Sequence, residues 1–171
     1  GISEISAEEE IECMALSDYI FSPSPAVKES LVSAGITADK ILDTSYGLKD
    51  DEIIQPAEKR PDHEVTVIFV GSIGVRKGIH LLLEAWQKAD VKAKLKIVGK
   101  IEPQIEDLVK GYLDRNENIE HVDFVDDLKP LYKHADLFIL PSLEEGSPLV
   151  TYLALGASLP VIASPMGGGG V

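Results

Sequence analysis

Residues 135–164 read ADLFILPSLEEGSPLVTYLALGASLPVIAS, and this stretch carries most of the information in the chain. An apolar strand over residues 135–140 runs into a turn that presents Glu145 beside a Gly-Ser-Pro corner. A helix then begins near Pro148, and a second strand follows over residues 160–163. The first amides of a helix have no partner within it and its dipole is positive there, so this arrangement predicts an anion site. A carboxylate beside that site indicates a ligand with both hydroxyls and phosphate, such as a nucleotide sugar.

The chain from residue 64 onward alternates between strand and helix patterns. We expect strands over residues 65–70, 93–98, 119–125, 135–140 and 160–163, with helices over 78–89, 103–114, 128–134 and 149–156. Residues 65–70 are a continuous apolar run, typical of a strand buried on both faces. Trp86, on the amphipathic helix 78–89, is expected in the core. The alternation predicts an α/β fold, a Rossmann-like doubly wound parallel sheet that binds ligands at the carboxyl ends of its strands.

The first 63 residues have a less regular pattern. We expect a helix over residues 3–17, short strands over 19–22 and 40–44, and a helix over 25–34 that Ser24 caps and Pro25 starts. Cys13 is expected as a small core residue of the first helix. Residues 48–63 are polar, contain two prolines and are typical of a linker.

Composition excludes several classes of function. The formal net charge of −13 disfavours nucleic acid and anionic membrane surfaces as partners. A single cysteine excludes an internal disulfide and favours a reducing compartment, so we expect a cytoplasmic protein. No run is long enough to span a bilayer. None of the four histidines pairs with a cysteine or carboxylates at metal-ligand spacing, so no metal site is expected.

A second glycine-rich segment, residues 71–78, reads GSIGVRKG and lies between a buried strand and a helix. Glycines there allow close backbone approach to a phosphate, and Arg76 and Lys77 can neutralise a diphosphate. An ordinary strand–helix turn with two solvated cations is the alternative. The glycine spacing differs from the dinucleotide fingerprint, and no Ser or Thr follows the lysine as in a P-loop.

Residues 141–162 resemble the donor-binding motif of retaining glycosyltransferases of family 4, which have the GT-B fold and belong to the group 1 glycosyl transferases. The family pattern is Pro-Ser-x-x-Glu-Gly-x-x-Leu-x-x-x-Glu-Ala-Met-Ala-x-Gly-x-Pro-Val-Ile. Positions in register are Pro141, Ser142, Glu145, Gly146, Leu149, Ala154, Pro160, Val161 and Ile162. Among the positions that depart from it, Leu153 stands where the family has a second Glu, which usually holds the ribose, and Ser158 stands where it has Gly.

The segment 71–78 is similar to the family loop Gly-Arg-x-x-x-x-Lys-Gly, with Ser72 in place of its Arg. The resemblance implies catalytic roles for Glu145, Lys77 and Arg76. It implies donor and phosphate contacts by Gly71, Ser72, Gly74, Gly146, Ser147, Pro148 and Leu149, and base contacts by Gly99, Lys100, Val125 and Asp126. It implies no cofactor or metal, and a nucleotide-diphosphate sugar as donor.

The resemblance also implies a domain organisation. Residues 1–47 would end an acceptor-side domain, 48–63 would link the domains, and 64–171 would be a nucleotide-sugar-binding domain truncated at its C-terminus. The expected activity is that of a hexosyltransferase acting on a glycan, lipid or small molecule, with the isolated fragment inactive. Membrane association is expected only through parts outside this chain. Two alternatives stay open: a degenerate binding or structural module, and a Rossmann-type oxidoreductase or epimerase.

Overall fold

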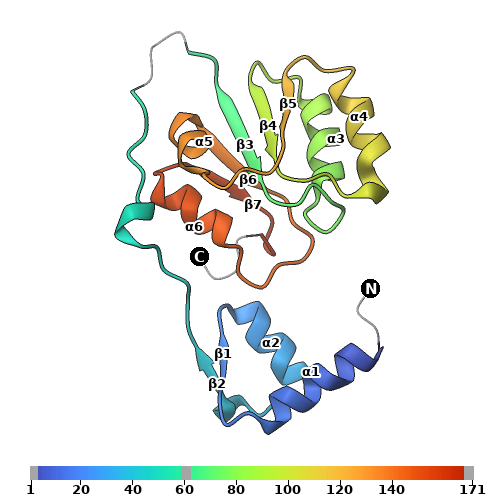
Figure 1. Ribbon diagram of the computed structural model, residues 1–171, viewed down its shortest axis with the longest axis vertical. Helices are drawn as coiled ribbons and strands as arrows, with labels where there is room; N and C mark the ends of the chain where they lie inside the picture. Colours follow the sequence, from blue (N-terminus) through green and yellow to red (C-terminus); the bar gives the residue numbers. More distant parts are fainter. Residues whose placement is uncertain (1–3, 59–62, 168–171) are drawn as a thin grey trace.

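The computed structural model describes residues 4–58 and 63–167, in which strands and helices alternate (Figure 1). The strands are β1 Ile20–Ser22, β2 Ile41–Asp43, β3 Thr66–Val70, β4 Lys94–Val98, β5 Ile119–Val122, β6 Leu137–Leu140 and β7 Val161–Ala163. The α-helices are α1 Glu4–Leu16, α2 Pro25–Ser33, α3 Ile79–Ala89, α4 Glu106–Leu113, α5 Lys129–His134 and α6 Leu149–Gly156. Three single-turn 3-10 helices are η1 Ala38–Lys40, η2 Asp50–Glu52 and η3 Pro103–Ile105.

Five strands form one parallel sheet in the order β5-β4-β3-β6-β7. The chain moves outward from β3 to β5 and then returns to the other side of β3, so the topology reverses between β3 and β6. Figure 1 shows α3 and α4 on one side of this sheet and α5 and α6 on the other. This is the doubly wound, Rossmann-like sheet that the sequence predicts, and in such sheets the crevice at the reversal is where ligands bind.

The apolar patterns explain this sheet. In β3, residues 67–70 are all buried, and Ile68 and Phe69 have no exposed surface. On α3, Leu82, Leu83 and Trp86 face the sheet, with Trp86 8% exposed, which confirms its predicted core position. Strand β5 ends at Val122, three residues before the predicted end of this strand.

Leu83→Ala is expected to lower the free energy of unfolding by about 2 to 5 kcal/mol, because Leu83 is fully buried and its loss leaves a cavity. Leu81→Ala on the same helix removes the same atoms from a side chain that is 43% exposed, so its cost should be much smaller. Urea unfolding followed by the fluorescence of Trp86 measures both. Equal costs would contradict the placement of α3 against the sheet.

Residues 4–43 form a smaller unit, which Figure 1 shows below the large sheet. Strands β1 and β2 pair in parallel, and α2 packs beside them over a small core of Leu31, Ile36 and Ile41. Ser24 caps α2 by accepting a hydrogen bond from Val27 N, as predicted.

One expectation for this region is wrong, and part of the expected linker makes packing contacts. Cys13 is exposed, because α1 lies on the surface, where Ile11 is also 49% exposed. The predicted linker begins as a segment that packs on the large sheet's unit: Ile54 is 8% exposed, and its N–H donates to Gly156 O at 2.9 Å. Residues 59–62 of that linker lie outside the described part of the chain.

Candidate nucleotide-sugar site

Two loops meet at the topological reversal of the sheet. The segment 71–78 leaves β3, and the segment 141–148 leaves the neighbouring strand β6. A hydrogen bond from Leu143 N to Arg76 O, at 2.9 Å, joins the two loops. The two sequence segments singled out for phosphate and sugar therefore lie together at the carboxyl edge of the sheet.

Lys77 and Glu145 form an ion pair between these loops, with Lys77 Nζ donating to Glu145 Oε1. Ser142 Oγ donates to the same oxygen at 2.9 Å, and Arg76 Nη1 lies 3.9 Å from Glu145 Oε2. The side chains of Lys77 and Glu145 are 12% and 7% exposed, whereas Arg76 is 54% exposed. Two cations thus flank the Glu145 carboxylate, one of them largely buried.

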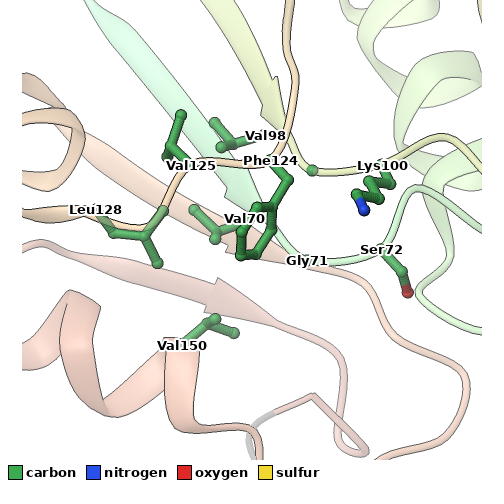
Figure 2. A pocket seen from close by; sticks show the side chains of 10 residues that line it. Val70, Gly71, Ser72, Val98, Lys100, Phe124, Val125, Leu128 and Val150 are labelled. Atoms are coloured by element: carbon green, nitrogen blue, oxygen red, sulfur yellow. The ribbon is translucent and has the colours of Figure 1, made fainter.

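A cavity of about 330 Å³ (Figure 2) is lined in part by Gly71, on which an added Cβ would lie 3.6 Å from the Lys77 side chain. Figure 2 shows Phe124, Leu128 and Val150 around it, with Lys100 to one side. Lys100 Nζ lies 5.7 Å from the centre of the Phe124 ring. The residues that line the cavity are Val70, Gly71, Ser72, Val98, Gly99, Lys100, Phe124, Val125, Leu128 and Val150. An apolar slot with a few polar groups at its edge suits a flat, partly apolar ligand group such as a nucleobase.

Five predicted site residues line this cavity: Gly71, Ser72, Gly99, Lys100 and Val125. Asp126 does not, and instead lines a neighbouring cavity of about 150 Å³ together with Leu153 and Glu52. Gly74 does not line the cavity either; it is buried, and an added Cβ would lie 2.2 Å from the Glu102 carboxylate.

The remaining predicted residues belong to the start of α6. Gly146 is exposed, and its carbonyl accepts a hydrogen bond from Ser24 Oγ at 2.5 Å. Ser147 Oγ lies 3.3 Å from the Tyr152 hydroxyl. Pro148 is buried at the cap position, and Leu149 is 55% exposed.

Sequence reasoning missed Phe124, Leu128 and Val150 as lining residues. Phe124 lies two residues past the end of β5 and is 62% exposed, and an aromatic residue close after a strand is a signal that could have found it. Leu128 and Val150 carry no such signal, because apolar helix residues look the same in sequence whether they face the core or a cavity.

Burial raises the pKa of Tyr132, whose hydroxyl therefore stays protonated and donates to Val150 O at 3.1 Å.

No group of three or more His, Cys, Asp or Glu side chains within residues 4–58 and 63–167 could hold a metal ion. His121 Nε2 instead lies 2.9 Å from Gly99 O, and His63 pairs with Asp136 at 2.8 Å. None of the helices in the described part of the chain combines the length and apolar character needed to cross a membrane.

Comparison with known proteins finds glycosyltransferases as relatives. The family described as "Glycosyl transferases group 1" matches residues 64–171. A sulfoquinovosyl transferase of Arabidopsis thaliana is 30% identical over 161 residues, covering 88% of this chain and 31% of that protein. An uncharacterized glycosyltransferase of Methanocaldococcus jannaschii is 34% identical over 113 residues, covering 63% of this chain and 29% of that protein.

Solved structures agree in fold. Sucrose-phosphate synthase from Thermosynechococcus elongatus superposes with a TM-score of 0.80 at 26% identity, over 96% of this chain and 45% of that one. Anabaena HepE in complex with UDP-glucose gives a TM-score of 0.81 at 18% identity, over 98% of this chain and 50% of that one. The chain thus spans half or less of the length of each of these relatives. From the family match over residues 64–171 and the shared parallel sheet, we conclude that the chain belongs to the group 1 glycosyl transferases.

Proposed function

We propose that this chain carries the donor-binding part of a retaining glycosyltransferase, which transfers a hexosyl group from a nucleotide-diphosphate sugar to a glycan, lipid or small molecule. The observation that supports it best is the Lys77–Glu145 pair at the reversal of the sheet, beside an apolar cavity. The solved structures of HepE with UDP and with UDP-glucose, to which this fold is similar, support a donor of this class.

The nucleotide would lie across the carboxyl edge of the sheet. Its base enters the cavity, in contact with Gly99, Lys100 and Val125, and the exposed ring of Phe124 offers a stacking surface. Its diphosphate meets Gly71 and Ser72 and the cations Lys77 and Arg76. Low exposure of Lys77 strengthens its attraction for the phosphate oxygens, because less water screens the charge.

Transfer requires the bond between the anomeric carbon and the diphosphate oxygen to break and a bond from that carbon to an acceptor hydroxyl oxygen to form, with the hydroxyl proton passing to the leaving diphosphate. Negative charge then grows on the leaving oxygen, and Lys77 and Arg76 stabilise it in place of a metal ion. Positive charge grows on the sugar ring, and the Glu145 carboxylate stabilises it while accepting hydrogen bonds from sugar hydroxyls. Residues 1–47 would end the acceptor-side domain, so we expect this chain alone to bind donor and scarcely turn it over.

A second candidate function is a binding or structural module whose donor site has lost catalysis. It is favoured by Leu153, which is partly buried against the core where the related motif has a ribose-binding Glu. This module would share the fold and fail to bind a nucleoside diphosphate.

Calorimetric titration at low salt with UDP, GDP, ADP and NAD distinguishes these functions. Saturable binding of one nucleoside diphosphate and none of NAD is the expected result, and it also identifies the base. Binding of NAD alone would indicate an oxidoreductase-type site. Failure of all four ligands to bind would favour the module without catalysis.

A further inference from the structure

The smaller N-terminal unit contacts the loop that carries Glu145. The Ser24 hydroxyl, at the start of α2, donates to the carbonyl of Gly146 at 2.5 Å, across 122 residues of sequence. Gly146 directly follows Glu145, and an added Cβ on it would lie 3.4 Å from Val27 of α2. Figure 1 shows α2 beginning below the loop that leads into α6.

Ser24 is itself held firmly. It is 4% exposed, its hydroxyl oxygen accepts a hydrogen bond from Val27 N at 3.3 Å, and its carbonyl accepts one from Ser22 Oγ at 2.9 Å. Ser22 is 1% exposed, and its own carbonyl accepts a hydrogen bond from Thr44 N at 2.9 Å, beside the β1–β2 pair. Three hydrogen bonds therefore hold Ser24 in place, so Ser24 can in turn hold the loop that it contacts.

The loop around Glu145 is thus held from two sides. On the side of the large sheet, Lys77 and Ser142 bind the Glu145 carboxylate, and Arg76 O accepts a hydrogen bond from Leu143 N. On the opposite side, Ser24 binds the next carbonyl along the loop. The carbonyl that Ser24 binds belongs to the Gly146–Ser147 peptide unit, directly after Glu145, so a shift of this part of the loop that redirects the carboxylate also disturbs the Ser24 bond.

We propose that Ser24 is a positioning residue that fixes the Glu145 loop for the sugar of the donor, so that sugar recognition depends on the N-terminal unit. The proposal rests on the proposed function, since it assumes that this loop meets the donor sugar. Ser24 neither lines the cavity nor belongs to the ion pair. It therefore acts on sugar binding through its hydrogen bond to Gly146 and leaves the base and diphosphate contacts unaltered.

Three substitutions separate the two roles of the hydroxyl. Ser24→Thr keeps both the cap of α2 and the donor to Gly146. Ser24→Asp keeps an oxygen that caps the helix but has no proton to donate, and Ser24→Ala removes both. Ser30→Asp, at an exposed position of the same helix, controls for the added charge.

The readout is the ratio of two dissociation constants, one for a nucleoside diphosphate and one for its sugar conjugate. The chain is titrated with UDP, GDP and ADP, and with the glucose, galactose and N-acetylglucosamine conjugates of each. Both ligands of a pair bind the same folded fraction, so the ratio holds even where a variant is partly unfolded. We expect Ser24→Asp and Ser24→Ala to weaken the sugar conjugate about five- to tenfold with the free diphosphate unchanged, and Ser24→Thr and Ser30→Asp to match the wild type.

Several results would overturn the inference alone. One is an unchanged ratio of dissociation constants in Ser24→Asp and Ser24→Ala. Another is an equal loss of affinity for both ligands of a pair. A third is a wild-type chain that binds a nucleoside diphosphate and binds none of its three sugar conjugates more tightly. A wild-type chain that binds no nucleoside diphosphate would instead overturn the proposed function, and this inference with it.

Discussion

Lys77→Met should weaken binding of the nucleoside diphosphate about 100-fold, because one charge-assisted contact to phosphate is lost from a site with little water. It should also lower the free energy of unfolding by about 3 kcal/mol, because Glu145 is 7% exposed and would keep only the more distant and more exposed Arg76 as a cation. Titration calorimetry measures the first effect and urea unfolding the second. The two effects have different causes, so they can be separated.

The double variant Lys77→Met with Glu145→Gln separates them. It leaves no unpaired carboxylate, so most of the lost stability should return while binding stays weak. Lys88→Met is the matched control, since Lys88 is 73% exposed and pairs with Glu84 on the surface, and it should leave both quantities unchanged. Recovery of binding in the double variant would show that Lys77 acts by holding Glu145 and makes no contact with phosphate.

The sequence was sufficient to predict the large sheet because its signals are local. A strand buried on both faces, such as β3, is apolar along its whole length, and helices such as α3 show the spacing of a single buried face. The spacing of the 141–162 motif likewise predicted a loop with a carboxylate at its turn. The pattern was weaker in α1, where Cys13 and Ile11 are exposed, because scattered apolar residues do not reveal whether another segment covers them.

Contacts between distant segments could not be predicted. Lys77 and Glu145 were predicted as site residues from the sequence. Their direct pairing, however, depends on β3 and β6 lying side by side. The hydrogen bond from Ser24 to Gly146 is less predictable still, because the cap of a helix carries no sign that its hydroxyl also reaches another unit. Local patterns predict which residues end a strand or start a helix, and three-dimensional packing decides which of them meet.

Gly78→Ala is expected to be severely destabilising, by about 4 kcal/mol. Gly78 begins α3 with a φ of +71°, a left-handed conformation that costs an L-residue about 1 to 2 kcal/mol. An added Cβ would also lie 2.0 Å from Pro141 O and 2.8 Å from Pro141 C. These are backbone atoms and cannot rotate away, so β6 or α3 must shift.

The clash lies at the joint between the two loops of the site, so the loss of stability should be accompanied by weaker binding. Gly78 directly follows Lys77, and Pro141 opens the loop that carries Glu145. A shift of either backbone separates the ion pair, and the affinity for the nucleoside diphosphate should fall together with the free energy of unfolding. Urea unfolding and calorimetric titration of the same preparation measure both.

Two other glycines isolate the cause. Gly35 has a φ of +92° with nothing within 4 Å of an added Cβ, so Gly35→Ala should cost only the conformational part, about 1 to 2 kcal/mol. Gly47 has neither constraint, so Gly47→Ala should be neutral or slightly stabilising, because it restricts the unfolded chain. The excess cost of Gly78→Ala over Gly35→Ala then measures the contact with Pro141. If the two costs were equal, the close approach of the two loops that places Lys77 beside Glu145 would be wrong.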